Sequence, residues 1–476
     1  MKKIKIPIGA RAAIVYTIAN IFSRGLAIIT MPIFTRIMSV EQIGVINLYN
    51  AWFAMISCIA TLALTSGGFS VAMSEYEGKR REYISSVLSL TSIIAAVIAI
   101  IYFCNPSFWN DVTGLSSELM IMMIIGLFVS PATEFWLAYQ RYEYRYKSSA
   151  LLVSVSALLA SALSIIVVLS MNSRKMTNIA EGRLIANNLI VYGIALILWC
   201  NIMMKGKKFI DISYWKFSLS LSLPLVGYAL ASQVLGVSDR MMIAKMVNNR
   251  AVGIYSTVYS VSSLFIMVWT AINSSFVPFL YQNLNKENKK IKNTSYTLLV
   301  GYSLVAILAV LLAPEIIKVL ATEEYYEAIY IMPPIAIGVY MTSVANMYSN
   351  ILLYVKKSKY IMYSSGIAAI LNVVLNQICI PIFGYMVAAY TTMISYIIML
   401  IILKCNASKT FKEIEGYSLN LVYDNRKILI LSIAIIVILL AGTFLYSYLI
   451  FRYVIITLLI VAIIVYGIKK IRNLSL

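Results

Sequence analysis

The sequence predicts an all-α polytopic membrane protein with about fourteen transmembrane helices, and three observations lead to this class. Hydrophobic residues make up 61% of the 476 residues and charged residues only 12%, with a mean hydropathy of +0.85. Soluble chains carry about 45–50% apolar and about 25% charged residues. Long apolar runs recur along the whole chain, and lysine and arginine gather in alternate connections between them. This composition excludes a cytosolic enzyme, a disordered regulator and a nucleic-acid-binding protein.

The apolar runs are long enough to cross a bilayer, which requires roughly 20 mostly apolar residues. Pro381 and Gly384 divide one run that is too long for a single span, and the stretch from Tyr446 to Arg452 divides the last one. No cleavage site follows the first run, which indicates an uncleaved first helix. The expected spans are 12–36, 43–70, 84–104, 118–140, 148–171, 183–204, 215–244, 251–281, 294–314, 326–355, 360–381, 384–403, 428–447 and 450–468.

The distribution of lysine and arginine predicts the orientation of these spans. Most of the 39 basic residues lie in alternate connections, among them Lys79–Arg81, Arg141–Lys147 and Lys205–Lys208, whereas the acidic residues divide evenly between the two sides. Basic connections face the cytoplasm according to the positive-inside rule, so we expect both termini there. The net charge of +20 is therefore a signal of topology, and it also attracts anionic membrane lipids.

Composition and connection length also exclude several kinds of catalyst. The chain has no histidine, and its five cysteines are scattered without CxxC spacing, so neither a histidine-based catalyst nor a metal site is expected. The outer connections are too short to fold into the catalytic domain of a glycan polymerase or acyltransferase. We therefore expect a protein that is not an enzyme and has no cofactor beyond a coupling ion, H⁺ or Na⁺.

An internal repeat divides the chain into two lobes. Residues 36–45 align with 245–254 at an offset of 209 residues, which also places Asn50 opposite Tyr259. An even number of spans separates the copies, so the repeat is parallel. Repeated lobes around a site at the membrane midplane are typical of alternating-access transporters. The expected domains are a six-helix lobe 1–208, a six-helix lobe 209–405, a cytoplasmic linker 406–427, and 428–476 with the last two helices and a basic tail.

Charged and polar residues inside the spans are the candidate site residues, because a charge within the bilayer is costly unless it meets water or a partner. Arg24, at the middle of the first span, either contacts an anionic headgroup, which we favour, or pairs with a carboxylate. Glu134 is either that partner or a titratable coupling group. Asp239 and Arg240 either contact substrate or pair at the membrane interface. The substrate-binding candidates are Arg24, Asn20, Asn50, Tyr259, Asp239, Arg240, Trp269 and Asn273, and the ion-coupling candidates are Glu134 and Asp239.

Two regions of the sequence resemble a known family. The segments Phe22–Leu26, Pro32–Arg36 and Glu41–Gly44 are similar to the opening of Wzx-type polysaccharide flippases. Ser238–Ile243 and Val252–Ser256 are similar to the start of the second lobe. These flippases share a superfamily with MATE drug exporters and lipid II flippases. The resemblance implies two lobes in a V that opens alternately to each side. It also implies a polyprenyl-diphosphate-linked oligosaccharide moved to the outer leaflet for O-antigen, capsule or teichuronic-type polysaccharide.

The chain departs from its relatives in two respects. Many Wzx-type members have twelve spans, whereas fourteen are expected here, as in lipid II flippases, where the additional pair contributes to a groove for the lipid tail. Many drug exporters carry an acidic residue in the first helix, where this chain has Arg24, which suits a diphosphate better. The alternatives are a cation-coupled multidrug or metabolite exporter of the same fold and a lipid II-type flippase.

The same resemblance sets the expected location and partners. We expect a multi-pass protein of the bacterial cell (cytoplasmic) membrane, with both termini in the cytoplasm. Its expected partners are the lipid-linked oligosaccharide, membrane lipids, and the glycan polymerase and glycosyltransferases of the same pathway. Nucleic acid is not an expected partner.

Overall fold

The computed structural model describes residues 8–66 and 68–474, and helices are the only regular elements within these ranges. Twelve helices are long and apolar enough to cross a membrane, or up to 13 when the two halves of the bent α9 count as one span. Each of the fourteen expected spans overlaps a different long helix, so the all-α membrane class is confirmed. The two chain ends, expected in the cytoplasm, lie outside the described residues.

The helices follow one another with short connections. The long helices are α1 (Ile8–Ile37), α2 (Val40–Thr61), α4 (Arg80–Cys104), α6 (Ser117–Tyr142), α7 (Tyr146–Ser173), α8 (Ile179–Gly206), α9 (Ile212–Met246), α10 (Asn249–Asn283), α11 (Asn288–Leu311), α13 (Met332–Tyr354), α14 (Lys359–Phe383), α15 (Val387–Glu415), α16 (Asn425–Ala441) and α17 (Leu449–Leu474). The short ones are α3 (Phe69–Glu75), α5 (Pro106–Thr113), α12 (Ala313–Leu320), η1 (Glu323–Ile331), η2 (Leu419–Leu421) and η3 (Gly442–Ser447).

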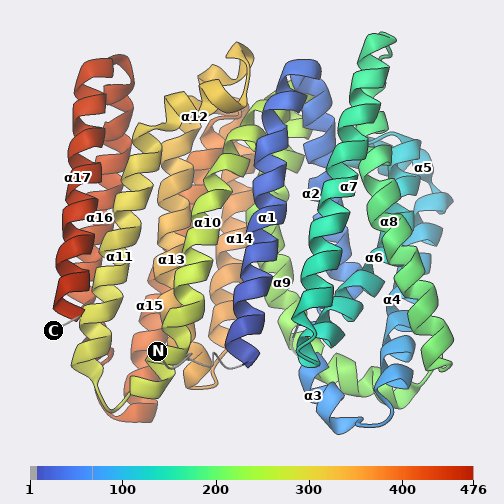
Figure 1. The fold of residues 1–476 in the computed structure, drawn as a ribbon, viewed down its shortest axis with the longest axis horizontal. Helices are drawn as coiled ribbons and strands as arrows, with labels where there is room; N and C mark the ends of the chain where they lie inside the picture. Colours follow the sequence, from blue (N-terminus) through green and yellow to red (C-terminus); the bar gives the residue numbers. More distant parts are fainter. Residues whose placement is uncertain (1–7, 67, 475–476) are drawn as a thin grey trace, which may run out of the picture. The chain divides into compact units, whose positions relative to one another are not determined.

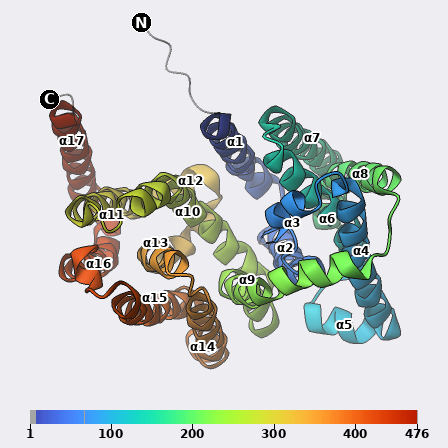
Figure 2. The ribbon, with the colours of Figure 1, turned by 90° about the horizontal axis from the view of Figure 1, so that it is seen from below.

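The chain divides into two compact units, Met1–Gly253 and Ile254–Leu476, called unit 1 and unit 2 below. In unit 1, α6 packs against α2, α4 and α8, while α1 packs along α7 and α2 along α9 (Figures 1 and 2). In unit 2, α15 packs against α13 and α14, and α11 contacts α16 and α17. The lobe boundary expected at residues 208 and 209 rests on the repeat and stays a prediction, as does the V-shaped arrangement.

Helix boundaries follow the internal repeat. α2 begins at Val40 and α10 begins at Asn249, 209 residues later. The residue before each start caps it: Ser39 Oγ accepts a backbone N–H at 3.2 Å, and Asn248 Oδ1 accepts one at 2.8 Å. Such caps satisfy a donor that the helix start would otherwise leave unpaired. The two copies therefore use equivalent residues to begin equivalent helices.

α2 ends earlier than the expected span 43–70. Leu62 and Ala63 adopt positive φ values of 47° and 51°, which end the ladder of helical hydrogen bonds. After a turn, the short helix α3 buries Phe69 and Met73, four residues apart on one face. The second expected span is thus a shorter transmembrane helix followed by a turn and a short packed helix.

The other expected breaks occur close to where the sequence places them. α9 bends by 52° between Leu223 and Leu225, where the sequence has Pro224. α14 ends before Gly384, whose φ of 78° favours glycine. α15 continues to Glu415, so the first part of the expected linker 406–427 is helical and the connection that remains is short.

Candidate functional site

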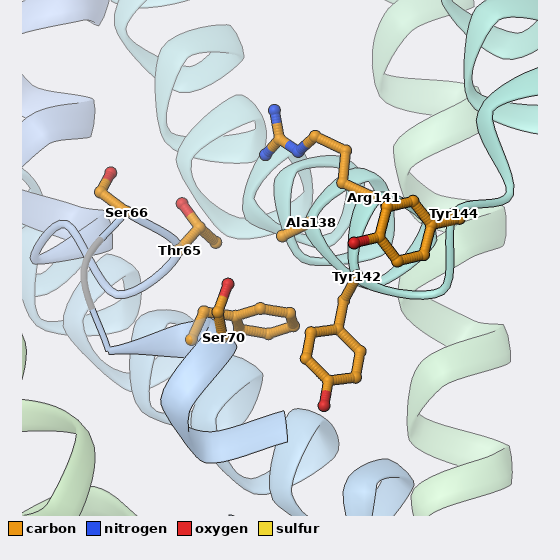
Figure 3. A pocket seen from close by; sticks show the side chains of 8 residues that line it. Thr65, Ser66, Ser70, Ala138, Arg141, Tyr142 and Tyr144 are labelled. Carbon is orange, nitrogen blue, oxygen red and sulfur yellow. The ribbon is translucent and has the colours of Figure 1, made fainter. Parts of the chain in front are cut away.

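Unit 1 contains a polar cavity of about 930 Å³ next to the end of α6. One side is formed by the turn after α2 and by α3, and the other by the last turns of α6 and the residues that follow (Figure 3). One arginine, three hydroxyl groups and two phenol rings face this space, and its lining residues include no carboxylate. The lining residues are Thr65, Ser66, Phe69, Ser70, Ala138, Arg141, Tyr142 and Tyr144.

The cavity lies at the end of unit 1 that carries the basic connections, called the basic end below. α3 lies at this end, at the bottom of Figure 1, between the end of α2 and the start of α4. Arg80 and Arg81 are the first two residues of α4 there. Arg145 is the N-cap of α7, and Lys147 is the second residue of that helix. The acidic residues Glu75, Glu77 and Glu82 lie in the same connection as Arg80 and Arg81, and Arg141 is the charged residue that lines the cavity.

The side of the cavity formed by α3 and Tyr142 is held in place by Arg80. Its Nε donates to the backbone oxygen of Met73 in α3 at 2.7 Å, and its Nη1 donates to Glu143 Oε1 at 2.9 Å. Its Nη2 donates to the hydroxyl of Tyr142 at 3.4 Å, and its guanidinium carbon lies 4.9 Å from the centre of the Tyr142 ring. Arg80 and Glu143 therefore neutralise each other while they fix the wall.

Arg141 remains available to a ligand. Within the described ranges its guanidinium forms no hydrogen bond or ion pair, and its side chain is exposed. The neighbouring carboxylate, Glu143, is already bound by Arg80 at 2.9 Å and approached by Arg145 at 3.9 Å. Glu134 lies two turns earlier on the same face of α6 and interacts with Arg141 only through space, so all five N–H donors of the planar guanidinium remain open to phosphate oxygens.

Tyr144 adopts a backbone conformation that favours glycine. Its φ is 54°, and the chain turns here because its N–H donates to the backbone oxygen of Arg141 at 3.1 Å. This left-handed conformation costs an L-residue with a side chain roughly 1–2 kcal/mol. The Tyr144 side chain is 52% exposed and lines the cavity (Figure 3). The same left-handed conformation follows three other helices at Lys175, Lys207 and Lys356, so at Tyr144 it marks the end of α6.

Glu134, a predicted coupling residue, lies one hydrogen bond away from the cavity lining. Thr65 Oγ1 donates to Glu134 Oε2 at 3.4 Å, and Thr65 lines the cavity. Glu134 is on α6, seven residues before Arg141, which places the two on the same face of the helix. A carboxylate and a guanidinium therefore lie about two turns apart along one face of this helix.

Arg24, Asn20 and Asn50 are exposed on α1 and α2. Among the described residues, the Arg24 guanidinium forms no hydrogen bond or ion pair, and no pair joins it to Glu134. The predicted alternative in which Glu134 neutralises Arg24 is therefore not the arrangement found here. Asn20 lies one helical turn from Arg24, so the two share a face.

Asp239 and Arg240 are engaged inside unit 1. Asp239 is only 1% exposed and has interactions within the protein. Arg240 Nη1 donates to the backbone oxygen of Gly236, one turn earlier in α9, at 2.6 Å. Their predicted roles in substrate binding and coupling stay predictions.

The remaining candidates lie in unit 2 and pack into its interior. Tyr259 and Trp269 are 9% and 3% exposed, and the Trp269 ring lies 5.3 Å from that of Tyr302. Asn273 accepts a hydrogen bond from Asn350 at 2.9 Å, which joins α10 to α13. These three residues therefore belong to the packing of unit 2, and their predicted roles in substrate binding stay predictions.

The cavity residues Arg141, Tyr142 and Tyr144 were not among the sequence candidates. Arg141 was counted only as part of a basic connection, although its spacing of seven residues from Glu134 places both on one helix face. The two tyrosines follow it directly in a polar turn, where a sequence gives no sign that a short helix closes over them. The contribution of α3 depends on the turn at Leu62 and Ala63, which no local propensity predicts.

A family model described as "Polysaccharide biosynthesis protein" matches residues 10–284, and a model described as MatE matches residues 224–378. A curated relative, the probable low-salt glycan biosynthesis flippase Agl15 of Haloferax volcanii, is 23% identical over 412 residues, which is 81% of each chain.

Two solved structures share the fold. The lipid II flippase MurJ in an inward closed conformation aligns with a TM-score of 0.63 at 17% identity, covering 92% of this chain and 100% of that one. An inward-facing multidrug resistance MATE family transporter aligns with a TM-score of 0.60 at 14% identity, covering 84% and 99%. At these identities the likeness shows a MATE-like and MurJ-like fold and carries no statement about substrate.

Proposed function

The chain belongs to the polysaccharide biosynthesis protein family, and from this membership we propose that it moves a polyprenyl-diphosphate-linked oligosaccharide across the cell membrane. The proposal is carried by the family match, which covers more than half of the chain, and a curated relative is named as a glycan biosynthesis flippase. The helical membrane fold supports a transporter rather than an enzyme, because moving a headgroup between leaflets needs a protected path and no bond cleavage. The product would serve cell-surface polysaccharide assembly.

Arg24 is our proposed contact for the diphosphate. An exposed, unpaired arginine at the middle of a transmembrane helix costs about 2.5–3.5 kcal/mol unless it meets water or a counter-charge. A diphosphate supplies that counter-charge, and Asn20 on the same face of α1 adds an amide for sugar or phosphate oxygens. Asn50 is likewise exposed, whereas Tyr259, Trp269, Asp239 and Arg240 are engaged within the protein and are weaker candidates.

Glu134 is our proposed coupling group. The chain has no histidine, so a proton that moves with the substrate requires a carboxylate. Glu134 is a carboxylate within a transmembrane helix, and it borders the cavity through Thr65. Uptake of H⁺ or Na⁺ by Glu134 would change the local charge near Arg141 and so bias the exchange between inward and outward states.

We also propose an orientation and a set of partners. The basic end would face the cytoplasm, where a lipid-linked saccharide is assembled by glycosyltransferases, and the opposite end would deliver it to a polymerase. The concentration of lysine and arginine at one end supports this orientation. The location we propose is the bacterial cytoplasmic membrane.

The function is tested in a strain from which this gene is deleted. We expect the strain to lose its surface polysaccharide and to accumulate the lipid-linked saccharide in the cytoplasmic leaflet, and we expect the wild-type chain to restore both. A strain with normal surface glycan and no accumulated intermediate would contradict the proposal.

A cation-coupled exporter of the same fold is the second candidate, because the MatE model matches residues 224–378. This candidate predicts efflux of cationic dyes from intact cells and loss of that efflux in Glu134→Gln. Dye efflux combined with unchanged surface glycan would favour the exporter over the flippase.

A further inference from the structure

We propose that the cavity at the basic end of unit 1 is a binding site for a sugar diphosphate, in which Arg141 contacts the phosphates and Tyr144 packs against the sugar. This inference rests on the proposed function, because it assigns the cavity to the headgroup before translocation. The predicted contact at Arg24 lies on a different helix, α1, and does not line this cavity. The cavity is therefore a second site for the same chemical class.

The lining fits an anionic sugar better than an apolar or cationic ligand. The guanidinium of Arg141 matches the oxygens of a phosphate, and the hydroxyls of Ser66 and Ser70 can donate to phosphate and sugar oxygens. Thr65 donates its O–H to Glu134, so its oxygen can only accept a hydrogen bond from a sugar hydroxyl. Arg141 is the charged residue among the lining residues, and Glu134 lies behind Thr65. A volume of about 930 Å³ lies within the range of ligand pockets and accommodates a diphosphate with one or two sugar rings.

The charge of Arg141 is preserved by its neighbours. Glu143, the carboxylate closest in sequence, is held by Arg80 at 2.9 Å and so does not neutralise Arg141. The same contact fixes Tyr142 through the 3.4 Å hydrogen bond from Arg80. Arg80 is therefore a positioning residue, which keeps the wall in place, and Arg141 is the lining residue whose guanidinium has no hydrogen bond or ion pair among the described residues.

Tyr144 provides the second, independent observation. A glycine would suit its φ of 54° better, yet the chain has a large aromatic residue here, and its ring faces the cavity (Figure 3). Aromatic rings pack their apolar faces against the C–H faces of sugars. Because the Tyr144 side chain is half-exposed and belongs to the lining, it is placed to contact a ligand in the cavity.

Phosphate could reach this cavity from two sources, a lipid-linked sugar or an ordinary anionic phospholipid, and the experiment distinguishes them. The full-length chain carrying Arg24→Ala, which removes the proposed diphosphate contact on α1, is placed in nanodiscs of phosphatidylcholine, and binding of radiolabelled farnesyl-diphosphoryl-N-acetylglucosamine is measured with and without the further variants. Farnesyl diphosphate and phosphatidylglycerol serve as competitors. We expect Arg141→Gln to weaken binding of the labelled probe at least about tenfold, because a charge-assisted contact is lost.

The matched control is Arg145→Gln. Arg145 lies four residues after Arg141 and carries the same charge, but its side chain does not line the cavity. We expect it to change the affinity less than about threefold. Equal effects of the two variants, or no effect of Arg141→Gln, would overturn the assignment. Displacement of the probe by phosphatidylglycerol as effectively as by unlabelled probe would assign the cavity to phospholipid headgroups and would also overturn it.

Tyr144→Gly separates ligand contact from structural role. Because glycine suits the left-handed turn, we expect the thermal stability of this variant to equal or exceed that of the wild type. We expect its affinity for the sugar-bearing probe to fall by about fivefold or more, while the affinity for farnesyl diphosphate is retained. Equal losses for both probes, or unchanged binding of the sugar-bearing probe, would refute the sugar contact.

The outcomes also separate this site from the proposed function. If the wild-type chain translocates the lipid-linked sugar and Arg141→Gln binds it normally, the proposed site is refuted and the proposed function stands. If the wild-type chain binds the probe through Arg141 but does not translocate it, the proposed function is refuted and the proposed site stands.

Discussion

Glu41 at the start of α2 forms an ion pair with Arg250 at the start of α10, with 3.3 Å between Oε1 and Nη1. The two residues are 209 positions apart, which is the offset of the internal repeat, so Glu41 in the first copy is equivalent to Arg250 in the second copy. Two equivalent helix starts therefore contact each other within unit 1 through a symmetric arrangement. The opposite charges at this one position make the contact complementary.

Two glycines make this close contact possible. A Cβ at Gly44 would overlap the backbone oxygen of Asn249, and a Cβ at Gly253 would overlap the backbone oxygen of Val40. Gly44 and Gly253 are themselves equivalent in the repeat, as are Val40 and Asn249. We expect Gly44→Ala and Gly253→Ala each to lower the free energy of unfolding by about 1–3 kcal/mol, measured by thermal unfolding in detergent, because the helices must separate.

The control for these variants is Gly193→Ala in α8, where an added Cβ meets no atom within 4 Å. Alanine in a helix interior is favoured over glycine by about 0.5–1 kcal/mol, so this variant should be at least as stable as the wild type. A Gly253→Ala variant as stable as Gly193→Ala would show that the helix starts are not in contact.

The sequence predicted the helices well because a membrane imposes a simple rule, a long apolar run between polar connections. The offset of the repeat also matches the structure, since Val40 and Asn249, 209 residues apart, begin equivalent helices. The sequence did not predict the cavity beside α6. That cavity depends on positive φ values at Leu62, Ala63 and Tyr144, which are set by tertiary packing rather than by the preferences of these residues.

The sequence also did not reveal the role of Arg452, which was expected at the outer end of a span. Its side chain is 2% exposed and pairs with Glu315, a residue 137 positions earlier in α12. A hydrogen bond from Tyr453 to Glu315 at 3.0 Å and one from Arg452 to the backbone oxygen of Tyr446 at 3.4 Å complete the cluster. Pairs this distant in sequence leave no local pattern.

Breaking this pair should be costly. Glu315→Leu leaves the charge of Arg452 buried without its partner, so we expect the free energy of unfolding to fall by about 3–5 kcal/mol. The double variant Glu315→Leu with Arg452→Met removes both charges and should recover most of that loss. Tyr453→Phe should cost only about 0.5–1.5 kcal/mol, because it removes one hydrogen bond. Thermal unfolding of the four proteins checks this order, and an equal loss in the single and double variants would contradict it.

The carboxyl group of Asp211, at the start of α9, makes the stability of the folded protein depend on pH. A hydrogen bond from Lys208 Nζ at 2.6 Å, followed by hydrogen bonds from Ser213, holds the pKa of the Asp211 carboxyl well below its usual value of 3.8. A lowered pKa stabilises the folded state above the usual pKa, and this contribution is lost as the pH falls toward the folded-state value. Asp211→Asn keeps the helix cap but removes the charge.

The wild type should therefore be more stable than Asp211→Asn at neutral pH, and the difference should decrease as the pH falls below about 4. Thermal unfolding in detergent across that range measures it. A difference that grows on acidification would show that the sign of the pKa shift is wrong.

Glu134→Gln tests the coupling proposal separately from binding. Glutamine preserves the size of the side chain and its hydrogen bond with Thr65, which is 3.4 Å long in the wild type, but it does not titrate. We expect the variant in proteoliposomes to translocate substrate slowly and at the same rate with or without an imposed H⁺ or Na⁺ gradient. As the matched control, Thr65→Val removes the hydrogen bond and keeps the carboxylate, so it should retain the response to a gradient. Acceleration of Glu134→Gln by a gradient would assign coupling to another residue.

The central claim is that this chain translocates a lipid-linked saccharide with Arg24 as a contact for the diphosphate. The direct test is a proteoliposome assay in which a short-chain polyprenyl-diphosphate saccharide in the inner leaflet becomes accessible to an external lectin. We expect wild-type protein to expose the saccharide. We expect Arg24→Ala to reduce the rate at least about tenfold while it folds and inserts normally, because a charge-assisted contact is lost. Wild-type liposomes that expose the saccharide no faster than protein-free liposomes would contradict the function, and an Arg24→Ala rate equal to wild type would contradict the role of Arg24.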